Sequence, residues 1–322
     1  MRPLLDVLSD LGSRFDAGLI LPSGGGLDGT NDTDGDGEAA QAAQAAAVEA
    51  ASAAVSDAAN ELSSVLSTVE DLDPAAAQAV AGTLSSLFDV QSATAGSESS
   101  ASAAAGISAA VDQLARAATA AALAAASAVN LTNGTLAAPV VISSPNLNMS
   151  INIRPATALA SAPIECDSSA GVPAAVNMPE DVLSNVPGID PSLPVAAVLH
   201  TSTVNLHDPA PGGGSVRRRR LSESHANATN ATTTASPTVS FTISQAGSEL
   251  KIEGAANPIN ISIPYQSSAA GTARPPCVGE AAEGASCDTV VVCQFWNKTS
   301  EQWSTDGCAT TLDATGAVGC SC

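Results

Sequence analysis

Between residues 38 and 130 the larger hydrophobic residues recur at the spacing of an α-helix, in a background of Ala, the strongest helix former. Apolar positions at i, i+3, i+4 and i+7 form one buried stripe per helix. Three stripes are present: Leu62, Val65, Leu66, Val69 and Leu72; Val80, Leu84, Leu87 and Phe88; Ile107, Val111, Leu114 and Leu123. The pattern predicts an Ala-rich helical subdomain over 38–130. The alternative is a solvent-exposed, low-complexity helix without a stable partner.

Local signals mark the ends of these helices. Asp73 followed by Pro74 predicts a helix start, because Asp caps free amide groups and Pro is tolerated in the first turn. The stretch AGSESS at 95–100 breaks the apolar pattern. Residues 1–37 predict a short amphipathic helix followed by an acidic Gly/Asp linker.

That linker contains a spacing that is similar to a calcium-binding loop. Asp32, Asp34 and Asp36 alternate and are followed by Gly. Ala43 stands where an EF-hand needs a bidentate Glu, so we interpret the segment as a flexible linker and expect no metal there.

After residue 130 the hydrophobic period changes from 3.6 to 2, as in half-buried strands. The alternating apolar residues are Leu147, Met149, Ile151 and Ile153, then Val239, Phe241 and Ile243, then Ile259, Ile261, Ile263 and Tyr265. A continuous apolar run predicts one more, buried strand at Val290, Val291 and Val292. Strands separated by Pro, Gly and Ser indicate an antiparallel β-sandwich over 131–322, with a disordered loop at 209–237. The predicted fold class is α+β, helices first.

The charge balance limits the function. The chain has 32 acidic and 11 basic residues, a formal net charge of −21, which argues against a nucleic-acid partner because phosphates would be repelled. Nucleophile-elbow, phosphate-loop and H-E-x-x-H motifs do not occur. His200 has no catalytic partner nearby in sequence, and His207 beside Asp208 is typical of a turn. We therefore expect neither an enzyme nor a bound cofactor.

Cysteine usage indicates an oxidising compartment. Six of the seven cysteines fall in the last 46 residues: Cys277, Cys287, Cys293, Cys308, Cys320 and Cys322. Such a cluster predicts disulfides or a metal site, and the lack of paired C-x-x-C spacings favours disulfides. Cys166 stands apart.

Glycosylation sequons indicate the same compartment. Eight of fifteen asparagines lie in Asn-x-Ser/Thr, whereas chance predicts about three: Asn31, Asn130, Asn133, Asn148, Asn227, Asn230, Asn260 and Asn297. A Ser/Thr-rich composition explains Asn227 and Asn230 as well, but explains Asn297, inside the cysteine cluster, less well.

The N-terminal residues do not show the signal peptide expected of a protein in an oxidising, glycosylating compartment. Asp6, Asp10 and Asp16 interrupt the first twenty residues, so no signal peptide is visible, and no uncharged apolar run is long enough to span a membrane. We therefore expect the chain to be a piece of a longer protein on the extracellular face of a membrane.

A run of four arginines lies in the predicted loop, at Arg217, Arg218, Arg219 and Arg220. A solvated charge run is the simpler interpretation. The alternative is cleavage by a subtilisin-like processing protease, whose acidic pocket accepts successive Arg side chains.

Both tryptophans of the chain lie among the clustered cysteines. Burying each would remove about 150–250 Å² from water, and a disulfide closing a loop of this size contributes about 3 kcal/mol. We predict core packing for Trp296 and Trp303.

The same stretch resembles the GPS motif of the GAIN domain, found in adhesion G-protein-coupled receptors and polycystin-type proteins. The matching residues are Cys293, Phe295, Trp296, Asn297, Trp303, Ser304, Gly307, Cys308, Cys320 and Cys322. GAIN domains are similar in placing helices before a β-sandwich. The resemblance implies disulfides between Cys293 and Cys320 and between Cys308 and Cys322. An extra bridge between Cys277 and Cys287 would leave Cys166 unpaired or bonded elsewhere.

Family members cleave themselves before the Thr or Ser of a His-Leu-Thr/Ser segment that follows the last cysteine. Because this sequence ends at Cys322, we expect it not to carry out that reaction. The resemblance implies an extracellular GAIN/GPS-type module, structural or signalling, with a C-terminal membrane segment as its partner and an unknown extracellular ligand. The alternative is a secreted or wall-associated structural glycoprotein with an Ala-rich stalk.

Overall fold

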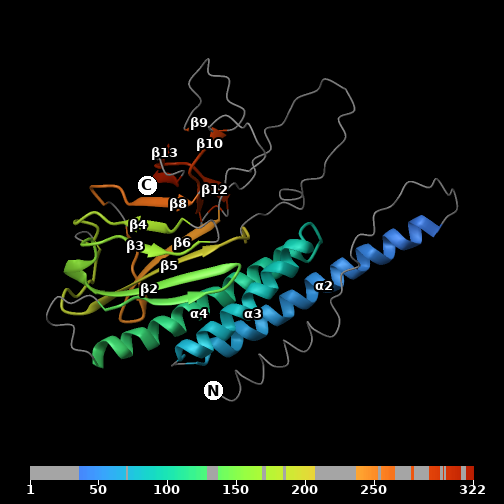
Figure 1. Ribbon diagram of the computed structural model, residues 1–322, viewed down its shortest axis with the longest axis horizontal. Coiled ribbons are helices and arrows are strands. Elements are labelled where there is room, and N and C mark those ends of the chain that lie inside the picture. The colour runs from blue at the N-terminus through green and yellow to red at the C-terminus, as the bar shows by residue number, and fades with distance from the viewer. Residues whose placement is uncertain are drawn as a thin grey trace. The chain divides into compact units, whose positions relative to one another are not determined.

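A computed structural model describes residues 36–69, 72–128, 137–168, 172–183, 186–206, 237–252, 255–264, 277–278, 290–297, 300, 302–312 and 317–322. Helices come first and strands second, which confirms the predicted α+β class (Figure 1). The predicted N-terminal amphipathic helix, Asp32 and Asp34 lie outside the described residues, as does the predicted loop at 209–237 except for its last residue.

The chain divides into two compact units. The described residues of the first are 36–69, 79–114 and 206. The described residues of the second fall within 72–78, 115–205 and 237–322. The helices are α2 (Asp36–Ser67), α3 (Pro74–Ala93) and α4 (Ser100–Ala128), and the division cuts α3 and α4 rather than following residue 130.

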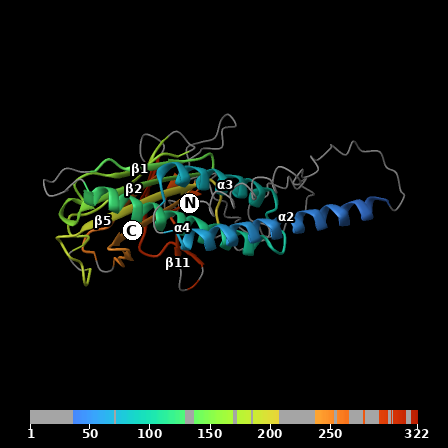
Figure 2. The same cartoon turned by 90° about the horizontal axis from the view of Figure 1, so that it is seen from below.

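The first unit is a packed helical bundle (Figures 1 and 2). Leu62, Leu84, Phe88 and Leu114 are all fully buried. The predicted stripes therefore face a core, and the alternative of an exposed, unpartnered helix is wrong for these residues. Small residues let α2 and α4 approach closely: a Cβ added at Gly106 would lie 3.2 Å from the Cβ of Ala59.

Side chains cap two of the helices. In the second unit, the Ala76 N–H donates to Asp73 Oδ1 at 2.9 Å, so Asp73 is the predicted cap of α3. In the first unit, the cap of α4 comes from another helix. The Glu49 carboxylate of α2 accepts 3.0 Å bonds from the backbone N–H groups of both Glu98 and Ser99. Spacing along the sequence contains no signal for such a long-range cap.

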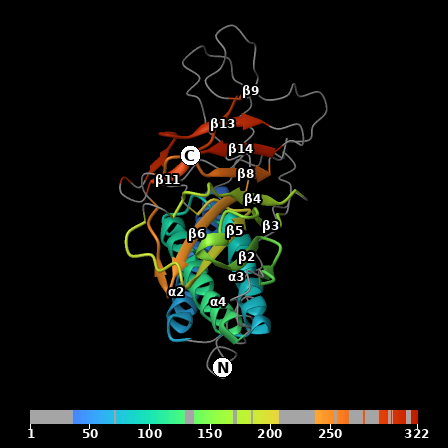
Figure 3. The ribbon, with the colours of Figure 1, turned by 90° about the vertical axis from the view of Figure 1, so that its left-hand side faces the viewer.

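The second unit contains two five-stranded antiparallel sheets. One has the order β1-β2-β5-β6-β7 and the bounds Val140–Ser143, Leu147–Pro155, Pro194–Ser202, Thr238–Gln245 and Ser248–Glu249. The other has the order β13-β14-β8-β4-β3 (Figure 3) and the bounds Ala309–Leu312, Ala317–Ser321, Asn260–Pro264, Ala174–Asn177 and Ile164–Cys166. A short 3₁₀ helix, η2, covers Ala156–Ala158.

Two small pairs of strands accompany these sheets. One pair is parallel, between β9 (Cys277–Val278) and β10 (Val290–Val291). The other is antiparallel, between β11 (Phe295–Asn297) and β12 (Gln302–Ser304). Val292, predicted to complete a buried run, is 42% exposed. The prediction was wrong there because β10 ends one residue earlier.

One core cluster joins the two large sheets. It contains Val195, Leu199 and Ile243 of the first sheet with Ile164 and Val176 of the second. Alternate residues of these strands point into it, as expected for a sandwich.

Strand β2 departs from the predicted half-exposed alternation, because every residue from 147 to 154 is buried. Register places Asn152 opposite Ala197 and Arg154 opposite Val195, so the polar face of β2 lies on the side of the core between the sheets. The Arg154 guanidinium donates to the carbonyls of Leu159, at 3.2 Å, and of Ala162 and Pro163. These hydrogen bonds explain how Arg154 can be buried on the core side of the strand.

Candidate functional site: the disulfide-clamped C-terminal strands

Strand β14 occupies an interior position of the second sheet. It pairs with β13 on one side and with β8 on the other, both antiparallel. Cys320 lies opposite Thr310 in one ladder and opposite Ile261 in the other. Strand β14 is therefore hydrogen-bonded along both of its edges (Figure 3).

Two disulfides fix this region covalently. One joins Cys293 to Cys320 across 27 residues, with the Cα atoms 5.7 Å apart. The other joins Cys308 to Cys322 across 14 residues, with the Cα atoms 4.2 Å apart. These are the pairs that the family resemblance implies. Because Cys308 lies between Cys293 and Cys320 in sequence, the two closed loops overlap.

The overlap of the two loops affects how the stabilising contributions of the two disulfides combine. Closing loops of these lengths restricts the unfolded chain by about 3 kcal/mol for each bridge taken alone. The second bridge constrains a chain that the first has already shortened. We therefore expect the pair to stabilise the region by less than the sum of the two.

The Cys293–Cys320 bridge is the inner one. Cys293, Val318 and Cys320 are buried in one cluster, with Ile261 and Leu312 packed against it. The Cys293 N–H also donates to Thr310 Oγ1 at 2.8 Å. In the outer bridge Cys308 is half-buried and Cys322 is exposed.

Gly319 directly precedes the bridged Cys320, and a side chain at this position would clash with the neighbouring strand. A Cβ at this position would lie 2.4 Å from Thr311 Oγ1 on the neighbouring strand. The Thr311 hydroxyl donates to the Gly319 carbonyl at 3.3 Å. The glycine thus allows β13 to approach the strand that carries Cys320.

The two tryptophans face each other across the β11–β12 pair. Trp296 lies opposite Trp303, with ring centroids 5.6 Å apart and an angle of 69° between the planes, an edge-to-face contact. Both are half-buried and Phe295 is 39% exposed, so full core packing of the tryptophans is not what the structure shows. A two-stranded pair buries only part of each ring. Gly307, with φ of +77°, forms the turn between β12 and β13.

Other predicted site residues lie elsewhere. Cys166 is a free thiol, 3% exposed in the sandwich core, and burial is the main cause that raises its pKa to about 11. Cys277 lies in β9, whereas Cys287 and the four arginines at 217–220 lie outside the described residues.

Of the eight asparagines in glycosylation sequons, three lie in the described residues. Asn260 is exposed at the start of β8, Asn297 is half-buried in β11, and Asn148 is buried in β2. The other five, Asn31, Asn130, Asn133, Asn227 and Asn230, lie outside the described residues.

The described side chains contain no group of three His, Cys, Asp or Glu placed to hold a metal ion. Among the helices of the described ranges, none combines the length and the apolar character needed to cross a bilayer. What the arrangement can do chemically is hold a strand: two covalent links and two ladders act on the same few residues.

Comparison with known proteins agrees with this architecture. The family model for the GPS, described as GAIN subdomain B, matches residues 135–322, more than half of the chain. The chain therefore belongs to the GAIN/GPS family.

Among solved structures, the full extracellular region of zebrafish Gpr126/Adgrg6 is similar, with 15% sequence identity and a TM-score of 0.49. The match covers 84% of this chain and 31% of that one, so the chain spans about a third of the zebrafish region. No curated protein matches the chain.

Proposed function

We propose that this chain is the extracellular GAIN/GPS module of a larger membrane protein, with a structural or signalling role rather than an enzymatic one. The observation that carries the proposal is the fixation of β14 by two disulfides and by ladders on both edges. A module built this way holds the strand that leads out of the domain. Family membership supports an extracellular, receptor-type setting.

The mechanism that we propose is mechanical. Pulling on Cys322 would load the bond to Cys308 and the ladder to β8 together. An interior strand must lose both sets of backbone bonds to leave, whereas an edge strand loses one. A force on a following membrane segment would therefore be resisted until both ladders shear. Whether a His-Leu-Thr/Ser segment follows decides whether the module also cleaves itself.

The partners in this proposal are a C-terminal membrane segment of the same protein and an extracellular ligand. Residues 38–130 would be the helical subdomain and 131–322 the sandwich subdomain, with the motif at 293–322. Asn260 and Asn297 would carry glycans at the surface, and the arginine run at 217–220 would be open to a processing protease.

The alternative, a secreted or wall-associated glycoprotein with an Ala-rich stalk, has less support. A stalk needs an extended, exposed helix, whereas Leu62, Leu84 and Phe88 are fully buried in a bundle. This burial favours a folded subdomain.

Extending the transcript past the codon for Cys322 tests the proposal directly. We expect it to encode His-Leu-Thr or His-Leu-Ser and then about twenty apolar residues, enough to cross a bilayer. A complete transcript that encodes no membrane segment would leave the secreted glycoprotein as the better explanation.

A further inference from the structure

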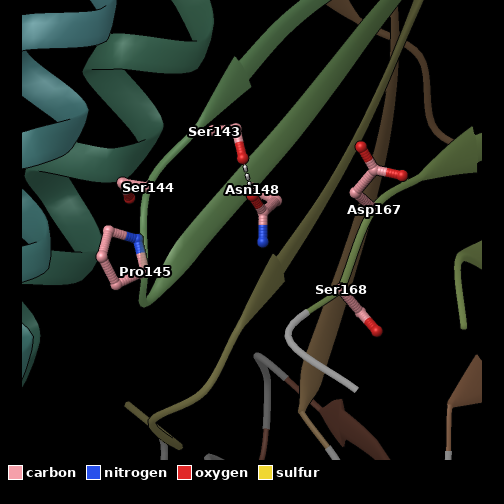
Figure 4. Close-up of a pocket in the computed structure, with 6 residues that line it drawn as sticks. All are labelled: Ser143, Ser144, Pro145, Asn148, Asp167 and Ser168. Atoms are coloured by element: carbon pink, nitrogen blue, oxygen red, sulfur yellow. Dashed lines mark hydrogen bonds between the residues drawn. The ribbon is translucent and has the colours of Figure 1, made fainter. Parts of the chain in front are cut away.

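An open cavity of about 500 Å³ lies at one end of the sandwich (Figure 4). Small and polar residues line it: Ser143, Ser144, Pro145, Asn148, Asp167 and Ser168. The first four come from the β1–β2 hairpin and the last two follow β3. All six belong to the second unit, so one compact body forms the cavity.

Asn148 is the residue with distinctive chemistry there. Its side chain is only 7% exposed, and its Oδ1 accepts a hydrogen bond from Ser143 Oγ. That bond fixes the amide, and Nδ2 points the other way, into the cavity (Figure 4). No described residue accepts a hydrogen bond from this nitrogen.

We propose that Asn148 carries an N-linked glycan whose first sugar sits in this cavity. The inference rests on the proposed extracellular setting, because the modification needs the secretory pathway. Asn148-Met149-Ser150 is a sequon, and Nδ2 is the atom that such a glycan modifies. In the structure, Nδ2 is the atom of the Asn148 amide that faces the cavity, whereas Oδ1 is bonded to Ser143.

The lining suits a sugar. Its size falls within the range of about 300–1,000 Å³ that is usual for small-molecule sites. The hydroxyls of Ser143, Ser144 and Ser168 already donate to Asn148 Oδ1 and to the carbonyls of Leu147 and Val172. Their oxygens and the carboxylate of Asp167 therefore offer acceptors for sugar hydroxyls. The ring of Pro145 offers an apolar surface for one face of the sugar. The opening of the cavity leaves a path for the rest of the glycan.

The order of events follows from the burial of Ser150. It is 2% exposed, and its hydroxyl accepts from Asn152 Nδ2 at 3.0 Å, so the folded sequon is closed to a transferase. Transfer must then precede the pairing of β2. Nδ2 forms a bond to C1 of a sugar on a lipid-diphosphate donor and loses one proton. The C1–O bond breaks, and the lipid diphosphate leaves with its electron pair. The folding sheet then closes around the first sugar.

Asn260 is the natural comparison within the same unit. It is exposed at the start of β8, and its Oδ1 accepts from Ser321 Oγ at 2.7 Å. A glycan at Asn260 would project into solvent. The two sequons therefore differ in whether the folded chain shields the linkage.

The first experiment maps occupancy on the protein purified from its own cells. Glycans are released with peptide-N-glycosidase in heavy-oxygen water after denaturation, and mass spectrometry identifies each labelled site. We expect label at both Asn148 and Asn260. Label at Asn260 without Asn148 overturns the inference and leaves the extracellular proposal standing. Label at no sequon overturns both.

The second experiment tests whether the first sugar of the Asn148 glycan lies in the cavity. The same enzyme is applied to the native, full-length glycoprotein, and we expect release at Asn148 about tenfold or more slower than at Asn260, because it needs local opening. The substitution Asp167→Ala should leave occupancy unchanged and speed release at Asn148 only. Asp306→Ala, on an exposed turn outside the cavity, should change neither rate. Equal release rates at the two sites in the native protein would show that the first sugar at Asn148 is not held in the cavity.

Discussion

Ile259 and Cys322 exchange two backbone hydrogen bonds: the Ile259 N–H donates to the Cys322 carbonyl at 2.9 Å, and the Cys322 N–H donates to the Ile259 carbonyl at 3.1 Å. The β8–β14 ladder thus continues one residue past Ser321, to the residue that is bonded to Cys308. Covalent and hydrogen-bonded restraints meet at Cys322. Substituting Cys308 removes the covalent restraint and leaves the backbone bonds in place, so mutation can separate the contribution of the disulfide.

Mild reduction of the native protein should open the Cys308–Cys322 bridge before the Cys293–Cys320 bridge. Attack on a disulfide needs access to a sulfur, and Cys322 is exposed, whereas Cys293 and Cys320 are each only 4% exposed. Alkylating the freed thiols at increasing reductant concentration and mapping the labelled peptides measures the order. Simultaneous labelling of all four cysteines would show that the buried cluster gives no protection.

Paired substitutions test the energies of the two bridges. Cys308→Ala with Cys322→Ala should lower the free energy of unfolding by about 3 kcal/mol or less, since a loop closure is lost. Cys293→Ala with Cys320→Ala should cost more, because it also leaves a cavity in a buried cluster. Urea denaturation followed by tryptophan fluorescence measures both. A larger loss for the outer pair would contradict the ranking.

Gly319→Ala should destabilise the second sheet by about 1–3 kcal/mol, as other overpacked sites do. The new methyl group would overlap Thr311 Oγ1, so either the Thr311 side chain rotates and loses its bond to the Gly319 carbonyl, or the strands shift. Adding Thr311→Ala removes that oxygen and should restore part of the loss. A double-mutant cycle from denaturation midpoints measures the coupling, and additive effects would refute the contact.

Gly82→Ala is the matched control for that experiment. Gly82 lies in α3, and a Cβ there would meet nothing within 4 Å. In a helix interior this change should stabilise by up to about 1 kcal/mol. Opposite signs for the two glycine substitutions would separate the strand contact from a general effect of adding a methyl group.

The helical half was predictable because its signals are local. Asp73 and Pro74 define the start of α3 within a few residues. Leu84 and Phe88 repeat at the helical period and are both fully buried. The cap by Glu49 on α4 was not predictable, since it joins residues some fifty positions apart.

The sandwich was harder to predict, because its strands do not all alternate. Strand β5, the partner of both β2 and β6, is a nearly continuous buried run, and such runs give no period-2 signal. In β2 the polar positions are buried too, and Arg154 reaches three carbonyls that no pattern in the sequence connects to it. The cysteine pairs were accessible only through the family motif, because spacing alone leaves several pairings open.

Glu49→Ala should lower the stability of the helical bundle by about 1 kcal/mol, the usual cost of losing a helix cap. Both carboxylate oxygens accept backbone N–H groups ahead of α4, where negative charge is also favoured by the helix dipole. Glu49→Gln keeps one acceptor and should cost less. Circular dichroism at 222 nm during urea unfolding measures the change. Equal losses for the two variants would show that the second acceptor and the charge do not matter.

Alkylation of Cys166 should be slow in the native protein. Its rate should still increase with pH in the range where the rate for an exposed thiol has reached its plateau. Burial, the main cause, raises its pKa from 9.0 to about 11, and the neighbouring Asp167 charge adds to the rise. Hydrogen bonds with Thr201 and Ser150 act in the opposite direction. At pH 8 the native thiolate fraction is then about a hundredfold below that of the unfolded chain, before access is counted.

The sign of the effect on stability follows from the same pKa. Because the folded pKa is above the unfolded one, the contribution of Cys166 is fully present below pH 9 and is lost as the pH rises to about 11. Iodoacetamide rates from pH 7 to 10, native and in urea, measure the thiol directly. Cys166→Ser is the control that should abolish labelling where no disulfide is reduced. Native labelling at pH 8 as fast as in urea would mean that this side chain is not held in the core.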